Sequence, residues 1–514
     1  MGQLDRRGFV GLMGAGTGVA LAIAGFSVAP AMAAGRLSGY PFTLGVASGD
    51  PLPDGVVLWT RLAPKPLAED GKGGMPQVIV PVEWEVAEDD NFRRIVAAGA
   101  ERATPELGHS VHVEVKGLRP GWVYFYRFRV GQDVSPVGRT KTAPALDASP
   151  DSLSFAFASC QNYPAGYFTA YKHMAAEDLD LVVHLGDYIY EGDSQGSIGR
   201  PHLPAAEIYS LADYRVRHAQ HKTDEDLQAA HAAFPWLVTW DDHEVENNYA
   251  NATRNGDAGP SEEFLQRRAA AYQAYYEFMP LRRAALPNGP DMQLYRRLSY
   301  GRLADFNVLD GRQYRSRQAD TQAERDDPSR TMLGAQQERW LADGLGASTR
   351  KWKVLAQQTV MARADRDPGP GLSLSDDNWS GYEPARQRTF DAVAERGVDN
   401  FVVITGDAHC SMVADLKLNF DDQNSPTIGA EFLGTSIASG GDGADMDARG
   451  ESWLASNPHM MYYNQRRGYV RCRVTPDEWR SDYRVMPYVT KPGAPVSTHA
   501  SFVVEAGRPG AQAD

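Results

Sequence analysis

Several short apolar runs in this chain, each typical of a buried β-strand, end where a residue able to bind a metal ion or a phosphate begins. In chain order these residues are Cys160 after SFAFAS, Asp187 after LDLVVHLG, Asp241, Asp242 and His243 after FPWLVTW, and Asp407 and His409 after FVVITG. Ligands of open α/β sheets bind beyond the carboxyl ends of the strands, so we expect these residues to converge. The pattern predicts a hydrolase with more than one metal ion.

The first 33 residues have the pattern of an export signal. Adjacent arginines, Arg6 and Arg7, precede a Gly- and Ala-rich apolar stretch, and Ala31-Met32-Ala33 forms a cleavage site. The paired arginines indicate the twin-arginine machinery. A membrane anchor is the alternative, but the stretch is only weakly apolar. We expect a periplasmic or extracellular protein with no transmembrane segment in the mature chain.

The net charge limits which partners the chain can bind, and the number of cysteines limits its disulfides. A formal net charge of −14 argues against a nucleic-acid-binding surface and gives no attraction to an anionic membrane. Three cysteines are too few for a disulfide framework. A bond between Cys410 and Cys472 is conceivable, and we expect Cys160 to stay free.

Residues 40–145 read as an all-β segment. Strand-like alternation of apolar and polar residues covers 55–60, 80–86 and 109–115. The stretch LRPGWVYFYRF, which starts at Leu118, resembles the turn and tyrosine-bearing strand of fibronectin type III modules. We expect a small β-sandwich, followed by a linker at 142–150.

From residue 151 onward, short strands alternate with helical segments, which predicts an α/β sandwich over 151–490. Helical patterns cover 206–234, 262–278, 336–344 and 386–396, and strands are expected at 302–309, 352–356 and 401–404. The last segment, 491–514, holds one strand-like run at 500–506, and we expect disorder after it.

Two motifs carry candidate ligands and a candidate acid. Asp187 in HLGDYIYEG can bridge two cations, and Tyr190 can bind as a phenolate if a strongly Lewis-acidic ion lowers its pKa. A strand end with a buried tyrosine is the alternative. In WDDHEVENN, Asp242 and Asn247 offer oxygen ligands that suit Ca²⁺. His243 can bind a phosphoryl oxygen or protonate a leaving group, although a solvated acidic loop has the same pattern.

Three further motifs add candidates. Asp407 and His409 stand at alternate positions of a tight loop in GDAHC. Cys160 in ASCQ can bind a metal as a thiolate, but a buried inert cysteine is equally consistent. Arg312 in DGRQYRS can fork onto phosphate oxygens or form a surface salt bridge.

The motifs ASCQ, HLGDYIYEG, WDDHEVENN, DGRQYRS, TGDAH and EFLGTSIASGG occur in the order seen in PhoD-like alkaline phosphatases. That family includes some calcium-dependent secreted phospholipases D. The resemblance, which runs from Tyr40 to Met486, implies a fibronectin-III-like β-sandwich followed by a four-layer metallophosphatase α/β sandwich. It also implies one ferric ion and calcium. The implied ligands are Cys160 and Tyr190 for iron, Asp187 as the bridge, and Asp242, Asn247, Asp407 and His409 to complete the metal shells.

We therefore expect a secreted phosphatase that hydrolyses phosphate monoesters and phosphodiesters at alkaline pH through a metal-bound hydroxide. His243 would assist the leaving group, and Arg312 would clamp phosphoryl oxygens. Three alternatives stay open: a phospholipase D acting on phospholipid headgroups, an inactive exported binding protein, and a zinc or manganese enzyme.

Overall fold

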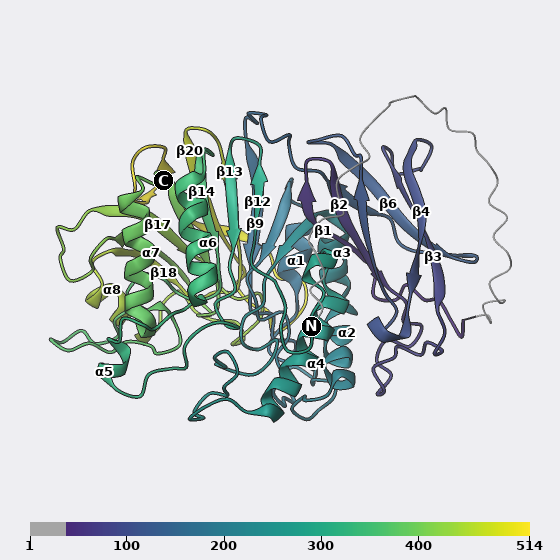
Figure 1. Ribbon diagram of the computed structural model, residues 1–514, viewed down its shortest axis with the longest axis horizontal. Helices are drawn as coiled ribbons and strands as arrows, with labels where there is room; N and C mark the ends of the chain where they lie inside the picture. The colour runs from purple at the N-terminus through teal and green to yellow at the C-terminus, as the bar shows by residue number, and fades with distance from the viewer. Residues whose placement is uncertain (1–36) are drawn as a thin grey trace, which may run out of the picture. The chain divides into compact units, whose positions relative to one another are not determined.

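Two large β-sheets lie face to face in the computed structural model, which describes residues 37–514 (Figure 1). The segment expected to be an export signal, 1–33, lies outside the described residues. In the described part of the chain, no helix combines the length and the apolar character needed to cross a membrane.

The first sheet has ten strands and a parallel centre. From edge to edge they are β22 (Gln512–Ala513), β21 (Ser497–Glu505), β20 (Glu478–Val485), β19 (Gly468–Val474), β9 (Leu153–Ala158), β10 (Leu181–His184), β11 (Pro235–Val238), β1 (Val46–Leu52), β2 (Gly55–Arg61) and β5 (Ser110–Lys116). His184 lies opposite Ala158 and Val238, because β9, β10 and β11 run parallel in register. Their carboxyl ends therefore meet at one edge of the sheet.

The second sheet has seven strands. In spatial order they are β12 (Arg296–Tyr300), β13 (Ala304–Val308), β14 (Trp352–Ala356), β15 (Phe401–Thr405), β17 (Thr427–Leu433), β16 (Ser411–Lys417) and β18 (Met460–Asn464). β13, β14, β15 and β17 are parallel. The strands expected at 352–356 and 401–404 are confirmed, and the one expected at 302–309 is slightly shorter.

Helices cover both outer faces of the paired sheets. The α-helices of the described residues are α1 (Thr169–Ala175), α2 (Leu211–Lys222), α3 (Glu225–Ala233), α4 (Glu262–Phe278), α5 (Gln322–Arg325), α6 (Gly334–Ala347), α7 (Glu383–Glu395) and α8 (Ala448–Ser456). α1, α3 and α4 pack on the first sheet, while α6 and α7 pack on the second. Between the sheets, Phe155 meets Phe306 edge-on with ring centroids 5.3 Å apart. These four layers confirm the expected α/β sandwich.

The helix expected at 262–278 is confirmed as α4. Ser261 caps it by accepting the N–H of Phe264, and Glu262 and Glu263 stand in the first turn, where the helix dipole favours negative charge. The polar stretch at 206–234 divides into α2 and α3.

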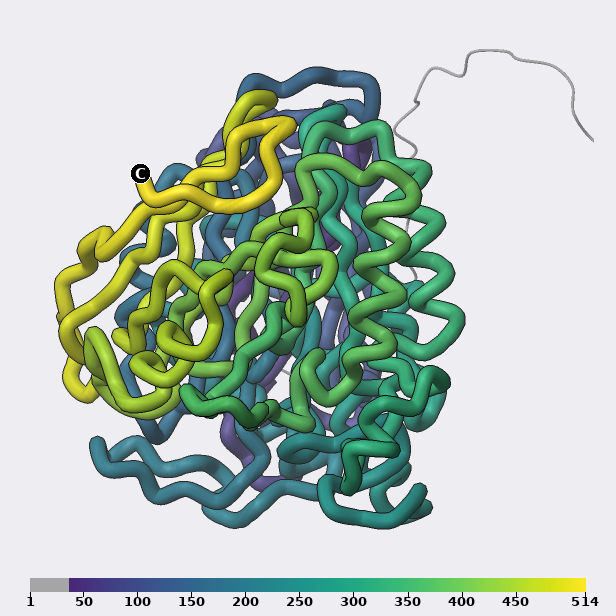
Figure 2. Tube along the Cα trace, turned by 90° about the vertical axis from the view of Figure 1, so that its left-hand side faces the viewer, coloured from purple at the N-terminus to yellow at the C-terminus, as the bar shows by residue number. Residues whose placement is uncertain are grey.

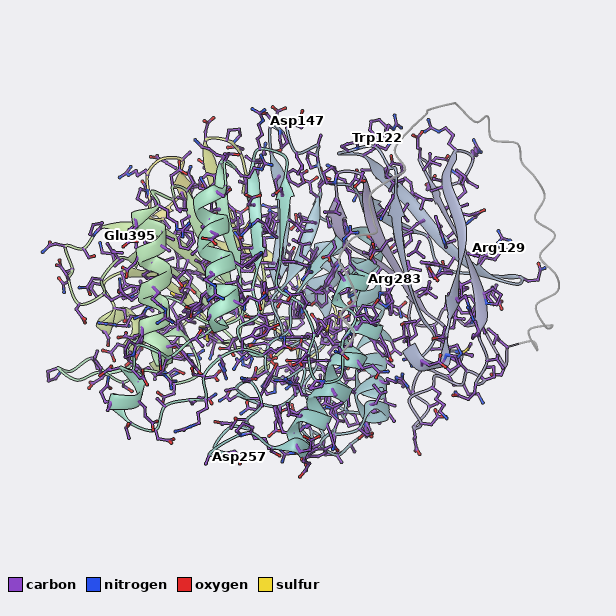
Figure 3. All side chains as sticks on the ribbon, viewed as in Figure 1. Trp122, Arg129, Asp147, Asp257, Arg283 and Glu395 are labelled. Atoms are coloured by element: carbon purple, nitrogen blue, oxygen red, sulfur yellow. The ribbon has the colours of Figure 1, made fainter. Side chains whose placement is uncertain are left out.

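The predicted β-sandwich forms, but it shares a sheet with the rest of the protein. Its second layer contains β4 (Ile95–Ala103), β3 (Val80–Ala87), β6 (Val123–Val130), β7 (Asp133–Val134) and β8 (Gly138–Lys141). Its first layer is β1, β2 and β5, which continue the ten-stranded sheet because β1 pairs with β11. Arg283, labelled in Figure 3, adds an ion pair to Glu101 of β4 at 2.6 Å.

The expectation of disorder at the C-terminal end was wrong. β21 pairs with β20, and β22 folds back onto β21, with Phe502 opposite Ala513. In Figure 2 this yellow segment runs beside the strands that precede it. The strand-like run expected at 500–506 lies largely within β21. After it, Ala511 packs on the core between the sheets and its N–H donates to Asp415 Oδ1 at 3.0 Å, which explains why this end of the chain is ordered.

All three cysteines are buried free thiols. Cys472 lies with its sulfur 3.5 Å from the Ser481 hydroxyl, so the conceivable Cys410–Cys472 disulfide is absent.

Three histidines of α2 and α3, His218, His221 and His231, are buried in the helical layer. Burial lowers the pKa of each well below its ordinary value. Neither ring nitrogen of His218 has a hydrogen-bond partner among the described residues. Below pH 6.5 the unfolded chain binds protons that these rings resist, so the free energy of unfolding should fall as the pH falls.

A His218→Leu variant should therefore lose less stability on acidification. Each such ring contributes a slope of about 1.4 kcal/mol per pH unit below its unfolded pKa, and the variant should lack one such contribution. Urea denaturation at a series of pH values measures the slope. His499→Leu, at an exposed histidine, is the control. Equal slopes in wild type and His218→Leu would contradict this explanation.

Candidate metal centre

The strand ends converge, as the sequence predicts. The residues that follow β9, β10, β11 and β15 approach one another beyond the carboxyl ends of these strands, and one oxygen each of Asp187, Asp241, Asp242 and Asp407 lies within 4.8 Å of the others. The first three of these strands belong to the ten-stranded sheet and β15 to the seven-stranded sheet. Both sheets thus contribute to the site.

The backbone at the site adopts a conformation that side chains rarely permit. Cys160, Asp187, Asp407 and His409 have φ of 61°, 54°, 68° and 55°, in the left-handed region. A residue with a Cβ is disfavoured there, and such outliers gather at functional sites. The turns aim these four side chains inward immediately after their strands.

One side of the cluster combines a thiol, a phenol and an imidazole. Ligand atoms of Cys160, Asp187 and His409 lie within 4.8 Å of one another. The Tyr190 hydroxyl lies 3.0 Å from Asp187 Oδ2 and 3.0 Å from His409 Nε2. Burial lowers the pKa of His409 to about 3, which keeps its ring neutral and able to bind a metal. Burial raises the pKa of Cys160 and of Tyr190 well above their ordinary values.

The other side is a crowd of buried carboxylates. Burial raises the pKa of Asp187 and Asp407 well above the ordinary value, and neighbouring aspartates add to the shift. Burial also raises the pKa of Asp241, to about 6. One oxygen each of Asp187, Asp241 and Asp242 is buried without a hydrogen-bond partner among the described residues. Such oxygens suit bound cations, and together with the thiol and imidazole they fit a centre with two kinds of metal ion.

Arg312 contacts the carboxylates of the cluster. Its side chain is fully buried, and its guanidinium donates to Asp241 and, at 2.9 Å, to Asp377. Its Nη2 lies 3.4 Å from Asp242 Oδ1. These contacts hold two aspartates of the cluster, Asp241 and Asp242, in place. Nη2 has no hydrogen-bond partner among the described residues, and the clamp on phosphoryl oxygens stays a prediction.

His243 is held by a carboxylate that the sequence did not single out. Its Nδ1 lies 2.6 Å from Glu191 Oε2, and its ring lies 4.2 Å from the Tyr190 ring. Burial lowers the pKa of His243, but Glu191, Asp242 and Asp187 together raise it well above the ordinary value. The imidazolium is partly exposed and stands beside the cluster. Glu191 belongs to HLGDYIYEG, where its position next to Tyr190 was the only available signal.

The predicted ligand Asn247 is exposed, and its backbone N–H donates to Glu191 at 2.6 Å. The next residue, Asn248, faces the cluster instead: its N–H donates to Asp242 Oδ2 at 2.6 Å. A φ of 54° at Asn248 turns the chain at this point. The exposed position of Asn247 does not favour a ligand role, whereas the Asn248 side-chain amide can donate to Asp242 Oδ2 at 3.1 Å. Two consecutive asparagines cannot be ranked from the sequence without the turn.

Glu244 joins two of the converging loops. It accepts the N–H groups of Asp187 and Tyr188, after β10, and of Asp241, after β11, at 3.1, 2.7 and 2.8 Å. This buried carboxylate therefore fixes the spacing between the candidate ligands that follow β10 and those that follow β11.

The fold and its ligand cluster define a metal-dependent hydrolase of the metallophosphatase class. The family model described as "PhoD-like phosphatase" matches residues 155–483, and the model "PhoD-like phosphatase, N-terminal domain" matches residues 27–144. The chain belongs to the PhoD-like phosphatase family.

Relatives agree with this assignment. "Alkaline phosphatase D" of Bacillus subtilis (strain 168) is 54% identical over 525 residues, covering 98% of this chain and 88% of that protein. A solved structure described as "Structure of PhoD" matches with a TM-score of 0.90 and 56% identity, covering 93% of this chain and 92% of that one. The purple acid phosphatase PPD1 from yellow lupin seeds has a TM-score of 0.52 at 12% identity, covering 91% and 74%, which indicates a shared fold alone.

Replacing Asp187 by Asn should separate two effects on the stability of the fold: repulsion among the buried carboxylates, which lowers it, and binding of cations, which raises it. In chelator, the variant should be more stable than wild type, because burial and the neighbouring aspartates disfavour the Asp187 carboxylate, which the variant lacks. Added metal should stabilise wild type and not the variant. Thermal unfolding with and without chelator measures both effects, and turnover should be abolished.

Asp147→Asn is the matched control, because Asp147, labelled in Figure 3, is an exposed residue of the segment between β8 and β9 and is not part of the cluster. It should behave as wild type in both conditions. A metal-free Asp187→Asn protein that is less stable than metal-free wild type would show that the carboxylates do not repel one another.

Proposed function

We propose that this protein is an exported alkaline phosphatase that hydrolyses phosphate monoesters and phosphodiesters with an iron and calcium centre. Membership in the PhoD-like family and 54% identity to a Bacillus subtilis alkaline phosphatase D support the phosphatase activity. The observation that carries the proposal is the donor set, with a thiol, a phenol and an imidazole on one side of Asp187 and carboxylates on the other.

The chemistry of the donors suggests how the metals divide. Cys160, Tyr190 and His409 suit a ferric ion, because a thiolate and a phenolate both need a strong Lewis acid to ionise them. Asp241, Asp242 and Asp407 offer the hard oxygens that Ca²⁺ prefers, and the Asn248 amide lies beside them. Asp187, shared by both groups, would bridge the two ions.

When bound, such cations neutralise charge on the phosphoryl oxygens and lower the pKa of a water molecule. The protein supplies the proton for the departing alcohol. His243 stands at the cluster, and Glu191, the carboxylate that does most to raise its pKa, lies beside Nδ1 and orients the ring so that Nε2 is free to donate. Tyr190 packs against the same ring. We therefore assign His243 as the general acid and Glu191 as the residue that positions it.

The cost of removing His243 should depend on the leaving group. His243→Ala should lower kcat on alkyl phosphates by about 10² or more, because a poor leaving group needs the proton. On p-nitrophenyl phosphate, whose leaving group is stable as an anion, the loss should be much smaller. Glu191→Gln should show the same leaving-group dependence with a smaller loss.

Glu246→Gln is the control, since Glu246 lies in the same loop and pairs with Arg267 at 2.5 Å, away from His243. Steady-state kinetics on a series of leaving groups gives the comparison. Equal losses on both kinds of substrate would remove His243 from the acid role.

Phospholipids are the second class of substrate to consider, and a cavity beside the cluster favours hydrophilic esters over them. The cavity measures about 430 Å³ and is lined by Asn248, Asn255, Gly256, Asp257, Ala258, Arg317, Gln318, Ala319, Asp320, Ser375, Asp376 and Asp377. No apolar side chain in this lining is larger than that of alanine, so acyl chains would gain little there.

Rates on a monoester, a bis-ester and phosphatidylcholine test this preference. We expect turnover of the first two and weak or no turnover of the lipid. Faster hydrolysis of phosphatidylcholine would favour a phospholipase D instead. Export by the twin-arginine machinery is supported by residues 1–33 of the sequence, and fractionation of cells tests it.

A further inference from the structure

The motif EFLGTSIASGG has no role in the chemistry described so far, yet its loop is bound tightly to the cluster. The loop follows β17, and Ser436 forms a bridge with Ser159. The N–H of Ile437 donates to Ser159 O at 3.0 Å, and the N–H of Ser439 donates to Cys160 O at 3.3 Å. Backbone hydrogen bonds therefore fix this loop against the strand end that carries the thiol.

These bonds place the Ser439 hydroxyl on the Tyr190 phenol. Ser439 Oγ lies 2.7 Å from Tyr190 Oη and 2.8 Å from Cys160 O, and it accepts the N–H of Asn162 at 3.1 Å. The side chain is 1% exposed, so bulk water cannot take the place of these partners. Ser439 thus contacts one candidate iron ligand directly and the backbone of another.

A serine hydroxyl has one proton, and here it has two acceptors. With a neutral phenol, Tyr190 donates to Asp187 Oδ2 at 3.0 Å, and Ser439 can donate to the Cys160 carbonyl. As a metal ligand, Tyr190 presents a phenolate oxygen, which is a stronger acceptor than a carbonyl. The Ser439 proton then turns to the phenolate by rotation of one torsion, with no movement of the backbone.

We propose that Ser439 is a positioning residue that donates a hydrogen bond to the metal-bound Tyr190 phenolate and tunes the ferric ion through it. This rests on the iron assignment made under the proposed function. A hydrogen bond withdraws electron density from the phenolate, so it raises the energy of phenolate-to-iron charge transfer and favours the ferrous state. A serine that only stabilised the loop would affect neither property.

The visible absorption spectrum of the purified, metal-loaded protein tests this role. Tyr190→Phe identifies the phenolate band by removing it. Ser439→Ala should move that band to longer wavelength and make the iron reduction potential more negative, with iron content unchanged. Ser439→Thr, which keeps the hydroxyl, should retain the wild-type band.

Ser436→Ala is the matched control in the same loop. Ser436 Oγ donates to Ser439 O at 2.8 Å and does not touch Tyr190. Removing the Ser436 hydroxyl loosens the loop but keeps the Ser439 hydroxyl as the donor to Tyr190, so the phenolate band should stay in place. The pair Ser439→Thr and Ser439→Val repeats the comparison at constant size if the alanine variant folds poorly.

The outcomes separate the two proposals. A phenolate band that Ser439→Ala and Ser439→Val leave unshifted would overturn the role of Ser439 and leave the iron assignment intact. Wild-type protein without iron and without the band would overturn the iron assignment and the role of Ser439 with it. A shift in both hydroxyl-free variants, absent in Ser436→Ala, supports the proposal.

Discussion

Repulsion among buried carboxylates is the constraint on which the site depends. Asp187, Asp241, Asp242 and Asp407 bring oxygens within 4.8 Å of one another in a buried setting. In such surroundings like charges interact strongly, and each carboxylate also loses its hydration. Arg312 and the His243 imidazolium offset part of this charge, but three carboxylate oxygens still have no hydrogen-bond partner among the described residues. Bound cations complete the balance, so the folded centre is built for metal.

The two-sheet fold is what permits this crowding. Each aspartate follows a strand whose hydrogen bonds and packing are independent of the site, and Glu244 ties the loops after β10 and β11 together. The unfavourable left-handed turns at Cys160 and Asp187 persist because both flanking elements are anchored in the cores. The stability of the sheets and helices thus maintains a local arrangement that would not form alone.

Much of this organisation is readable from the sequence. The strand ends, the four-layer sandwich and helix α4 follow from apolar periodicity and from capping residues such as Ser261. What the sequence could not supply has physical causes. Arg312 could be placed at the site, but its partner Asp377 lies 65 residues away in a polar loop without a pattern. The choice between Asn247 and Asn248 depends on one backbone torsion, which no pattern of residue types reveals.

The contacts that support the ligands are the part that sequence patterns could not supply. Glu191 and Ser439 both stand inside recognisable motifs, yet their roles come from pairs such as Ser439 with Tyr190, 249 residues apart. Similarly, β1 joins β11 through a parallel pairing that neither strand's own pattern encodes. Local periodicity defines elements, whereas the loops at their ends take their function from partners distant in the chain.

The most direct test is the metal content of the protein produced with its own N-terminal segment, measured by elemental analysis after gentle purification. We predict iron and calcium together in each chain, with the iron oxidised. Protein that is fully active with zinc or manganese and contains neither iron nor calcium would contradict the assignment of the thiolate, phenolate and carboxylate ligands.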